Sequence, residues 1–390
     1  MRQHGWADAD IQADGIIAAS GREQCVLTKA KWILRTLVVC AALLLLVVAM
    51  LAWPVPTWRT GETPLPVLVY APQAAALAQA GRVWVDADAA CGTGQHRDPD
   101  DCLALLSLSL EKNITLVGIS TVFGNAPVTE TDAVMRALVQ EIRPRGARPL
   151  PVFRGCAAIA PDCQNHGGSL EAQDALIAAL QAGALDVVAL GPLTNIAAVI
   201  GREPTLARRI TRVVAVMGRR PGHRFHPSEN HGAGAMLFGH GPIFRDLNAV
   251  LDPQAVAVIL HSGIPMVLLP YTATRKVSVT SADLDAIAGT GTAGRWVAER
   301  CHDWLAFWRS KAGLEGFYPF DLMAAAYLRD PSQFHCARVS AWVGDDALLP
   351  WFSGGDALLV SQDTLPPSVD SSGTALYCDV VRVRVVSLFE

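Results

Sequence analysis

The sequence has little charge and no excess of positive charge. Only 17% of its 390 residues are charged, and the formal net charge is −4. Proteins that bind nucleic acid concentrate Lys and Arg on one surface, so this composition argues against a nucleic-acid partner. The sequence also lacks internal repeats of about 20–50 residues, which argues against a solenoid or propeller. One large α/β domain with an appendage is the expectation for this length and composition.

One long uncharged segment lies near the N-terminus. Residues 36–53 are 18 positions without a charge, which is close to the roughly 17–25 residues that a membrane-spanning helix needs. Four basic residues precede the segment and one follows it closely: Arg22, Lys29, Lys31, Arg35 and then Arg59. The excess of positive charge on the N-terminal side predicts that the N-terminus is cytoplasmic. A cleaved signal peptide is the alternative, although its charged region would be unusually long.

This segment divides the chain into four parts. We expect residues 1–35 to be a cytoplasmic segment, residues 36–53 a single transmembrane or signal-anchor helix, and residues 54–80, rich in Pro, Ala and Gln, a linker. Residues 81–390 then form one domain. The expected location is the cytoplasmic (inner) membrane, with a single span and the domain on the extracytoplasmic, periplasmic side.

Seven of the nine cysteines lie beyond the apolar segment. In an oxidising compartment some of them can pair. Cys156 and Cys163 bracket a short loop that contains proline and are the best candidates, with Cys336 and Cys378 as a second pair. Because seven is odd, at least one of these cysteines stays free or pairs elsewhere. The alternative is that several are small buried hydrophobic residues.

Apolar runs and amphipathic stretches alternate from residue 81 onward. Residues 82–88 and 114–125 are typical of strands, and residues 128–142 are typical of a helix. Regular alternation of this kind predicts a doubly wound, mostly parallel sheet. The strands are continuous apolar runs, as expected when helices cover both faces. Residues 375–389 alternate Val with Arg and Asp, which predicts an edge strand or one exposed on one side.

Residues 293–311 are predicted to form a helix with an aromatic stripe, made of Trp296, Trp304, Phe307 and Trp308. Such a stripe usually packs into the core, and lining a pocket is the alternative. Residues 218–245 form a long stretch rich in Gly, Pro, His and Arg. A loop of this length is usually functional or disordered.

Five aspartates fall within sixteen positions, between an apolar run and a helical stretch. Asp98, Asp100 and Asp101 can be explained by the helix dipole, which favours acids in a first turn by about 0.3–1 kcal/mol each. That does not explain Asp86 and Asp88, whose alternation in a strand directs both side chains to one face. Ca²⁺ takes roughly 6–8 oxygen ligands in irregular geometry. The cluster therefore indicates an oxygen-rich site for a hard cation.

Seven motifs in order resemble one known family. The acidic motif Asp86-x-Asp88 is followed by Asp100-Asp101, and then by GISTVFGN, ALGPLTNIA, VVAVMG, DLNAVLDPQA and FDLMAAAYL. Together they resemble the inosine–uridine preferring nucleoside hydrolase family over most of residues 81–335. The resemblance implies an enzyme that hydrolyses the N-glycosidic bond of ribonucleosides with a calcium-activated water. It also implies that the partner is a small-molecule ribonucleoside. A homo-oligomer is compatible with the resemblance.

The resemblance further implies which residues hold the calcium. By this comparison the ligands are Asp88, Asp101, Asp321 and the backbone carbonyl near Leu190. Asp88 would also act as the general base, and Asp86 would be a supporting carboxylate. A base of this kind typically contributes about 10²–10⁴-fold to the rate.

A second group of residues matches positions that bind the nucleoside. The resemblance assigns ribose contacts to Asp100, Asn125 and Asn248, with Asp246 at a position where the family usually has Glu. It also implies that His166 lies near the nucleobase.

Two departures from the family pattern bear on the chemistry. Eleven residues separate Asp88 from Asp100, where the family has a much shorter loop, so the metal site requires this insert to bulge outward. Phe320 replaces a His that commonly protonates the departing base, and a phenyl ring cannot donate a proton. Phe320 can instead stack on the base, and Tyr318, His166 or His302 could supply the proton. A catalytically weak ribonucleoside-binding or structural protein with the same fold is the alternative function.

The charge bias around residues 36–53 predicts the side of the membrane on which the domain lies. A phosphatase fused after residue 60 should be active in a bacterial host, because phosphatase reporters fold only outside the cytoplasm. The measurement is phosphatase activity, with a cytoplasmic reporter fused at the same position as control. An inactive phosphatase together with an active cytoplasmic reporter would reverse the orientation.

Overall fold

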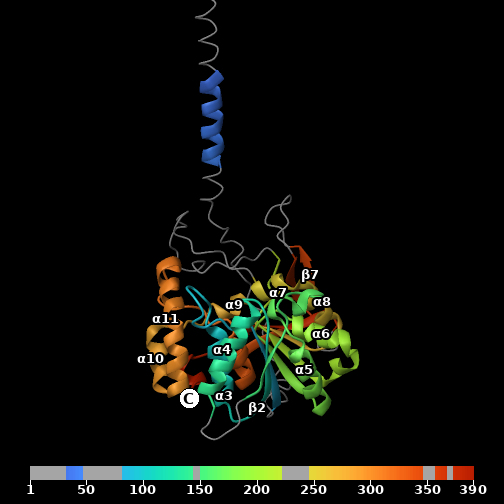
Figure 1. Cartoon of the computed structure of the whole chain (residues 1–390). Helices are drawn as coiled ribbons and strands as arrows, with labels where there is room; N and C mark the ends of the chain where they lie inside the picture. The colour runs from blue at the N-terminus through green and yellow to red at the C-terminus, as the bar shows by residue number, and fades with distance from the viewer. Residues whose placement is uncertain (1–31, 47–80, 144–149, 222–245, 346–355, 367–371) are drawn as a thin grey trace, which may run out of the picture. The chain divides into compact units, whose positions relative to one another are not determined.

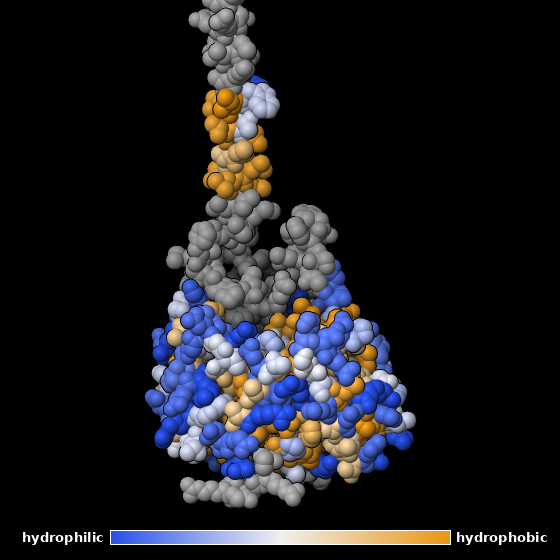
Figure 2. All heavy atoms as spheres, in the orientation of Figure 1, coloured by the Kyte–Doolittle hydropathy of each residue, from blue (hydrophilic) through white to orange (hydrophobic). Residues whose placement is uncertain are grey.

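The computed structural model describes residues 32–46, 81–143, 150–221, 246–345, 356–366 and 372–390 (Figure 1). Residues 32–46 form a helix with exposed, mostly apolar side chains (Figure 2). The expected membrane span of residues 36–53 is therefore covered only in part, because residues 47–53 and the expected linker of residues 54–80 lie outside the described residues. Among the helices in the described ranges, none has both the length and the apolar character needed to cross a membrane.

The domain from residue 81 is built on one sheet, which has nine strands within the described residues. Their order across the sheet is β3-β2-β1-β4-β5-β6-β9-β7-β8. The strands are β1 (Gly81–Ala87), β2 (Ile114–Thr121), β3 (Val152–Arg154), β4 (Leu185–Ala189), β5 (Ile210–Ala215), β6 (Met266–Leu268), β7 (Phe334–Asp345), β8 (Asp356–Thr364) and β9 (Thr374–Val380). Pairing is parallel from β3 through β6 to β9, and antiparallel from β9 to β7 and β8.

Helices cover both faces of this sheet (Figure 1). One face packs against α3 (Asp100–Leu110), α4 (Val128–Glu141), α10 (Ser281–Gly289), α11 (Thr292–Ala312) and α12 (Leu322–Arg329). The other packs against α5 (Glu171–Ala182), α6 (Thr194–Arg202) and α8 (Pro253–His261), while α7 (Leu247–Leu251) and α9 (Tyr271–Thr274) follow β5 and β6 along the chain.

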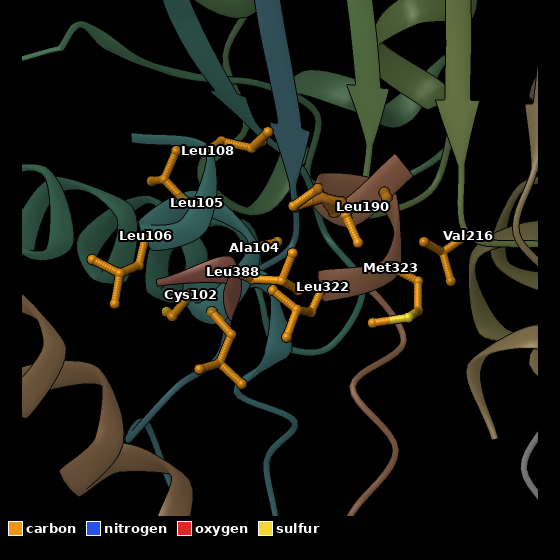
Figure 3. Close-up of a cluster of buried hydrophobic side chains, with 14 of the residues drawn as sticks. Cys102, Ala104, Leu105, Leu106, Leu108, Leu190, Val216, Leu322, Met323 and Leu388 are labelled. Carbon is orange, nitrogen blue, oxygen red and sulfur yellow. The ribbon is translucent and has the colours of Figure 1, made fainter. Parts of the chain in front are cut away.

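Alternation along β1 shows why both faces are buried. Val83 and Val85 belong to one hydrophobic cluster, and Trp84 between them belongs to the other. Figure 3 shows part of the first cluster, to which α3 contributes Leu105 and α12 contributes Met323. Successive strand residues point to opposite faces, so a strand covered on both sides must be apolar throughout. The predicted doubly wound, mostly parallel sheet is confirmed.

The prediction for the C-terminal strand is wrong in its placement. Strand β9 lies inside the sheet between β6 and β7, and the strand ends at Val380, before most of the charged alternation. The edge is formed instead by β8, which the sequence pattern did not reveal. Local alternation reports how one strand is exposed, whereas position in the sheet depends on which distant strands pair with it.

Both expected disulfides are present. Cys156 pairs with Cys163, and Cys336 pairs with Cys378, its direct register partner across β7 and β9. A third disulfide, which the sequence did not suggest, joins Cys91 to Cys102. Within the described ranges, the free cysteines are the exposed Cys40 and the buried Cys301. The third bond connects the loop after β1 to the first turn of α3.

Candidate functional site

A cavity of about 290 Å³ lies at the carboxyl ends of the parallel strands. Open α/β sheets bind ligands at this end, because loops from neighbouring strands converge there. Seven residues singled out in the sequence line the cavity: Asp100, Asn125, Leu190, Asp246, Asn248, Phe320 and Asp321. They come from the start of α3, the segments after β2 and β4, the start of α7 and the start of α12. The fold therefore gathers residues from across more than two hundred positions of sequence into one site.

Three buried carboxylates meet next to this cavity. Each of Asp88, Asp101 and Asp321 offers an oxygen, and these oxygens lie within 4.8 Å of one another. Their exposed fractions are 0%, 0% and 4%. The sequence prediction that these acids come together is thus met by the geometry.

Burial and mutual repulsion make this cluster unfavourable without a counter-charge. Burial raises the pKa of Asp88 well above its usual range, and the negative charge of Asp101 raises it further. Burial, followed by the negative charge of Asp100, raises the pKa of Asp101 to about 8 and that of Asp321 well above its ordinary value. Asp101 Oδ2 is buried and has no hydrogen-bond partner among the described residues. A divalent cation would compensate both the charge and the missing partner, so the residues fit a metal ion.

Backbone donors fix the three segments that carry these acids. The N–H of Asp88 donates to Asp101 Oδ1 at 3.1 Å, and the N–H of Asp321 donates to Asp100 Oδ2 at 2.8 Å. Helix α3 begins after Pro99, and none of its acids makes a side-chain capping bond. The carboxylates of Asp100 and Asp101 therefore bind backbone groups of other segments and do not cap their own helix.

The side chain of Asp88 is held from two sides. Asn125 donates to it through its backbone N–H at 2.9 Å and through Nδ2 at 3.2 Å. Gly124 leaves room on the opposite side, because a Cβ built there would lie 1.8 Å from Asp88 Oδ2. Gly191 is similarly close, with a Cβ position 3.0 Å from that of Asp88. The bonds from Asn125 and the close approach of Gly124 and Gly191 thus restrict the Asp88 side chain.

Leu190, whose backbone carbonyl is the expected fourth oxygen ligand, lines the cavity directly after β4. Asn248 donates to this carbonyl oxygen through Nδ2 at 2.7 Å. A carbonyl has two lone pairs, so this oxygen can accept a second partner. The backbone N–H of Leu190 is bound to the carbonyl of Asp86 at 2.8 Å, which fixes its position at the end of β4. Leu190 therefore connects Asn248 to the end of β1.

Asp86 has a different role from the clustered acids. It is fully buried and accepts hydrogen bonds from Ser120 Oγ and from Asn195 Nδ2, the latter at 2.8 Å. Ser120 in turn accepts from Trp84 Nε1 at 2.8 Å. Burial raises the pKa of Asp86 to about 7. These bonds connect β1 to β2 and α6 beneath the site, which agrees with the supporting position expected for Asp86.

Asp246 and His166 differ in how they lie relative to the cavity. Asp246 lines the cavity, but its two oxygens accept from the backbone N–H groups of Gly218 at 2.7 Å and Ala249 at 3.3 Å. It therefore caps α7, and burial raises its pKa to about 6. His166 is exposed and does not line the cavity, because it lies in a short 3₁₀ turn (Asp162–Gly167) beside the Cys156–Cys163 disulfide. The expectation that His166 lies at the cavity is wrong in this structure.

Aromatic side chains form one wall of the cavity. Phe320, Trp304 and Tyr271 line it, and the rings of Tyr271 and Phe320 stack at 6.2 Å with a 27° tilt. Trp308 packs behind, with its ring centre 6.4 Å from that of Phe320. The aromatic stripe on α11 therefore both packs into the core and lines the cavity. Trp308 belongs to the core, and Trp304 also faces the cavity.

The insert after β1 is only partly turned outward. Ala89 and Cys91 are buried, residues 92–97 are exposed or half-exposed, and His96, Arg97 and Asp98 return to line the cavity. The expectation of an outward bulge therefore holds for the middle of the insert and fails for its end. The Cys91–Cys102 disulfide, which the sequence did not suggest, closes the insert onto α3.

Sequence comparison finds relatives over most of the domain. Residues 83–349 match the family profile described as inosine-uridine preferring nucleoside hydrolase. The pyrimidine-specific ribonucleoside hydrolase RihA of Citrobacter koseri is 31% identical over 160 residues, which cover 40% of this chain and 46% of that protein. RihA of an Enterobacter species is 29% identical over 204 residues, which cover 52% of this chain and 58% of that protein. The chain thus spans about half the length of these relatives.

Solved structures show the same fold. A plant nucleoside hydrolase superposes with a TM-score of 0.61 at 19% identity, over 80% of this chain and 98% of that chain. A purine-preferring ribonucleoside hydrolase from Gardnerella vaginalis superposes with a TM-score of 0.57, also at 19% identity, over 79% of this chain and 95% of that chain. At this identity the likeness supports the fold.

The close approach of Gly124 to Asp88 gives a test of the site. Gly124→Ala should displace the Asp88 carboxylate and weaken divalent-cation binding, and overpacking of this kind typically costs about 1–3 kcal/mol of stability. The measurements are cation affinity by calorimetry and melting temperature. Gly201→Ala is the matched control, since a Cβ there meets nothing within 4 Å. Unchanged cation affinity in Gly124→Ala would show that Asp88 does not contact the cation.

Proposed function

Because the chain belongs to the inosine–uridine preferring nucleoside hydrolase family, we propose that it hydrolyses the N-glycosidic bond of ribonucleosides to give ribose and the free base. The observation that carries the proposal is the cluster of Asp88, Asp101 and Asp321 beside a cavity with one polar side and one aromatic wall. A nucleoside has the same division, with a hydroxyl-rich sugar and a flat base. The cavity therefore offers a matching surface to each half of the substrate.

We further propose that the cation is calcium. Asp88, Asp101, Asp321 and the carbonyl of Leu190 would hold it, and all four ligands are oxygens. Hard oxygen donors without His or Cys favour Ca²⁺ or Mg²⁺ over transition metals, and the uneven donor set suits the flexible coordination of Ca²⁺. When bound, such a cation lowers the pKa of a coordinated water and fixes the hydroxyls of the sugar.

The chain's own residues position and deprotonate the attacking water. Asp88 takes the proton as the water attacks the anomeric carbon, and the two bonds from Asn125 keep its carboxylate aimed at the site. A single displacement by water forms no covalent bond to the protein, so the product should have inverted configuration. Hydrogen bonds between the ribose hydroxyls and Asp100, which would accept, and Asn125 and Asn248 would hold the anomeric carbon in line with the water.

The aromatic wall is suited to the base. Phe320, Trp304 and Tyr271 can pack against a flat heterocycle, and such ring contacts contribute about 0.5–1.5 kcal/mol each. The names of the relatives include both pyrimidine-specific and purine-preferring enzymes. We therefore propose ribonucleosides as the substrate class.

One observation favours a second function. Phe320 stands where a proton-donating His is common in the resembled family, which would suit a catalytically weak ribonucleoside-binding protein. Release of reducing sugar from a panel of nucleosides distinguishes the two, because a binding protein would be stabilised by nucleosides without releasing ribose.

Removal of calcium should abolish hydrolysis and lower the melting temperature. A ligand that binds only the folded state stabilises it by about 2.7 kcal/mol at a concentration a hundredfold above its Kd. The measurement is activity and thermal unfolding after treatment with a chelator, with recovery on adding back Ca²⁺ or, for comparison, Mg²⁺. Activity that is indifferent to chelation would contradict the metal site.

Asp88→Asn should lower kcat by at least about 10²-fold, which is the lower end of the range for loss of a general base. The amide keeps the shape of the side chain but cannot take a proton from water. Asp174→Asn is the control, since Asp174 is a 64% exposed carboxylate paired with Arg202 away from the cavity. Near-normal turnover in Asp88→Asn would assign the base to another residue.

A further inference from the structure

The end of the insert places a histidine at the cavity on the side of the aromatic wall. Among the described residues that line the cavity, His96 is the only histidine. Tyr318, His302 and His166, which the sequence offered as proton donors, do not line it. We propose that His96 is the general acid that protonates the departing base. This inference rests on the proposed nucleoside hydrolysis.

Helix α11 holds His96 in place. The backbone N–H of His96 donates to Asp303 Oδ2 at 2.5 Å, and Nδ1 of its ring lies 3.6 Å from the same oxygen. The ring also packs on Phe307, with centroids 4.7 Å apart. The Asp303 carboxylate therefore lies on the Nδ1 side of the ring. Nε2 is then the ring nitrogen left to act on a ligand.

The backbone of the insert is built around this residue. His96 has a φ of +58°, in the left-handed region that non-glycine residues seldom adopt. Such a conformation persists only where surrounding contacts impose it, and it concentrates at functional sites. Those contacts are the Cys91–Cys102 disulfide on one side and the bond from Arg97 to the carbonyl of Asn125 on the other. Both ends of the loop are therefore tied down around His96.

A continuous chain of rings connects His96 with the expected base position. Phe307 contacts Trp304 with centroids 5.0 Å apart, Trp304 contacts Trp308 at 6.1 Å, and Trp308 contacts Phe320 at 6.4 Å. Both ends of this chain, His96 and Phe320, line the cavity. His96 therefore belongs to the wall that faces the base and is separate from the carboxylates that face the sugar.

The proton balance of the reaction is complete with these two residues. As the bond from the anomeric carbon to the base nitrogen breaks, its electron pair leaves with the base. In its protonated form, His96 gives the proton on Nε2 to a nitrogen or oxygen of the base, which departs neutral. Water forms the new bond to the anomeric carbon and loses its proton to Asp88. Solvent then returns a proton to His96 and removes one from Asp88.

The test compares leaving groups in the full-length protein. His96→Asn removes the acid, and Asn tolerates the left-handed backbone better than most residues. With inosine and uridine, kcat should fall by about 10²–10⁴-fold. With 4-nitrophenyl riboside it should change no more than a few-fold, because nitrophenolate leaves without a proton. His302→Asn is the matched control, as His302 is exposed on α11 next to Asp303 and does not line the cavity.

The outcomes separate the possible failures. Unchanged nucleoside hydrolysis in His96→Asn would overturn the proposal, and so would an equal loss on all three substrates in a variant that unfolds at the wild-type temperature. If His96→Asn unfolds early, Asp303→Asn provides the second test, and it should lower nucleoside hydrolysis while sparing the nitrophenyl riboside. Wild-type protein that cleaves neither nucleosides nor the nitrophenyl riboside would instead refute the proposed function itself.

Discussion

Repulsion among three buried carboxylates is the constraint on which this site depends. Asp88, Asp101 and Asp321 are brought together by separate segments, and burial raises the cost of charging each of them. Proteins tolerate such groupings where a cation offsets the charge. The surrounding structure keeps the acids in position through backbone donors, and glycines leave room for Asp88. These contacts hold the three carboxylates close together against their mutual repulsion.

The parallel sheet explains why the site can be assembled at all. Strands β1, β2 and β4 are neighbours and end at the same edge. Asp88, Asn125 and Leu190 follow these three strands, so each is delivered to one place by its own strand. The aromatic wall comes from later in the chain, on α11 and before α12. The cavity thus has a polar side formed by segments that follow the parallel strands and an aromatic side formed by α11 and the segment before α12.

The sequence was sufficient for features that depend on local pattern. Alternating runs predicted the doubly wound sheet, and motif order indicated Asp88, Asp101 and Asp321 as neighbours. It was insufficient for contacts that only tertiary packing creates. His96 and Asp303 are 207 positions apart, and nothing near either residue signals the other. The interior place of β9 was missed for the same reason, since a strand's neighbours are chosen by the whole sheet. A short motif predicted that His166 lies near the nucleobase, but the turn that carries His166 does not bring it to the cavity.

The Cys91–Cys102 disulfide links the fold of the site to the redox conditions around the protein. Cys91 lies three residues after Asp88, and Cys102 directly follows Asp101, so the bond joins the two segments that carry these acids. Closing a loop of this size lowers the entropy of the unfolded chain by an amount worth about 3 kcal/mol. The same bond also closes the insert that carries His96. A reductant that opens it would loosen the sugar side and the base side together, which makes the site sensitive to the thiol balance of its compartment.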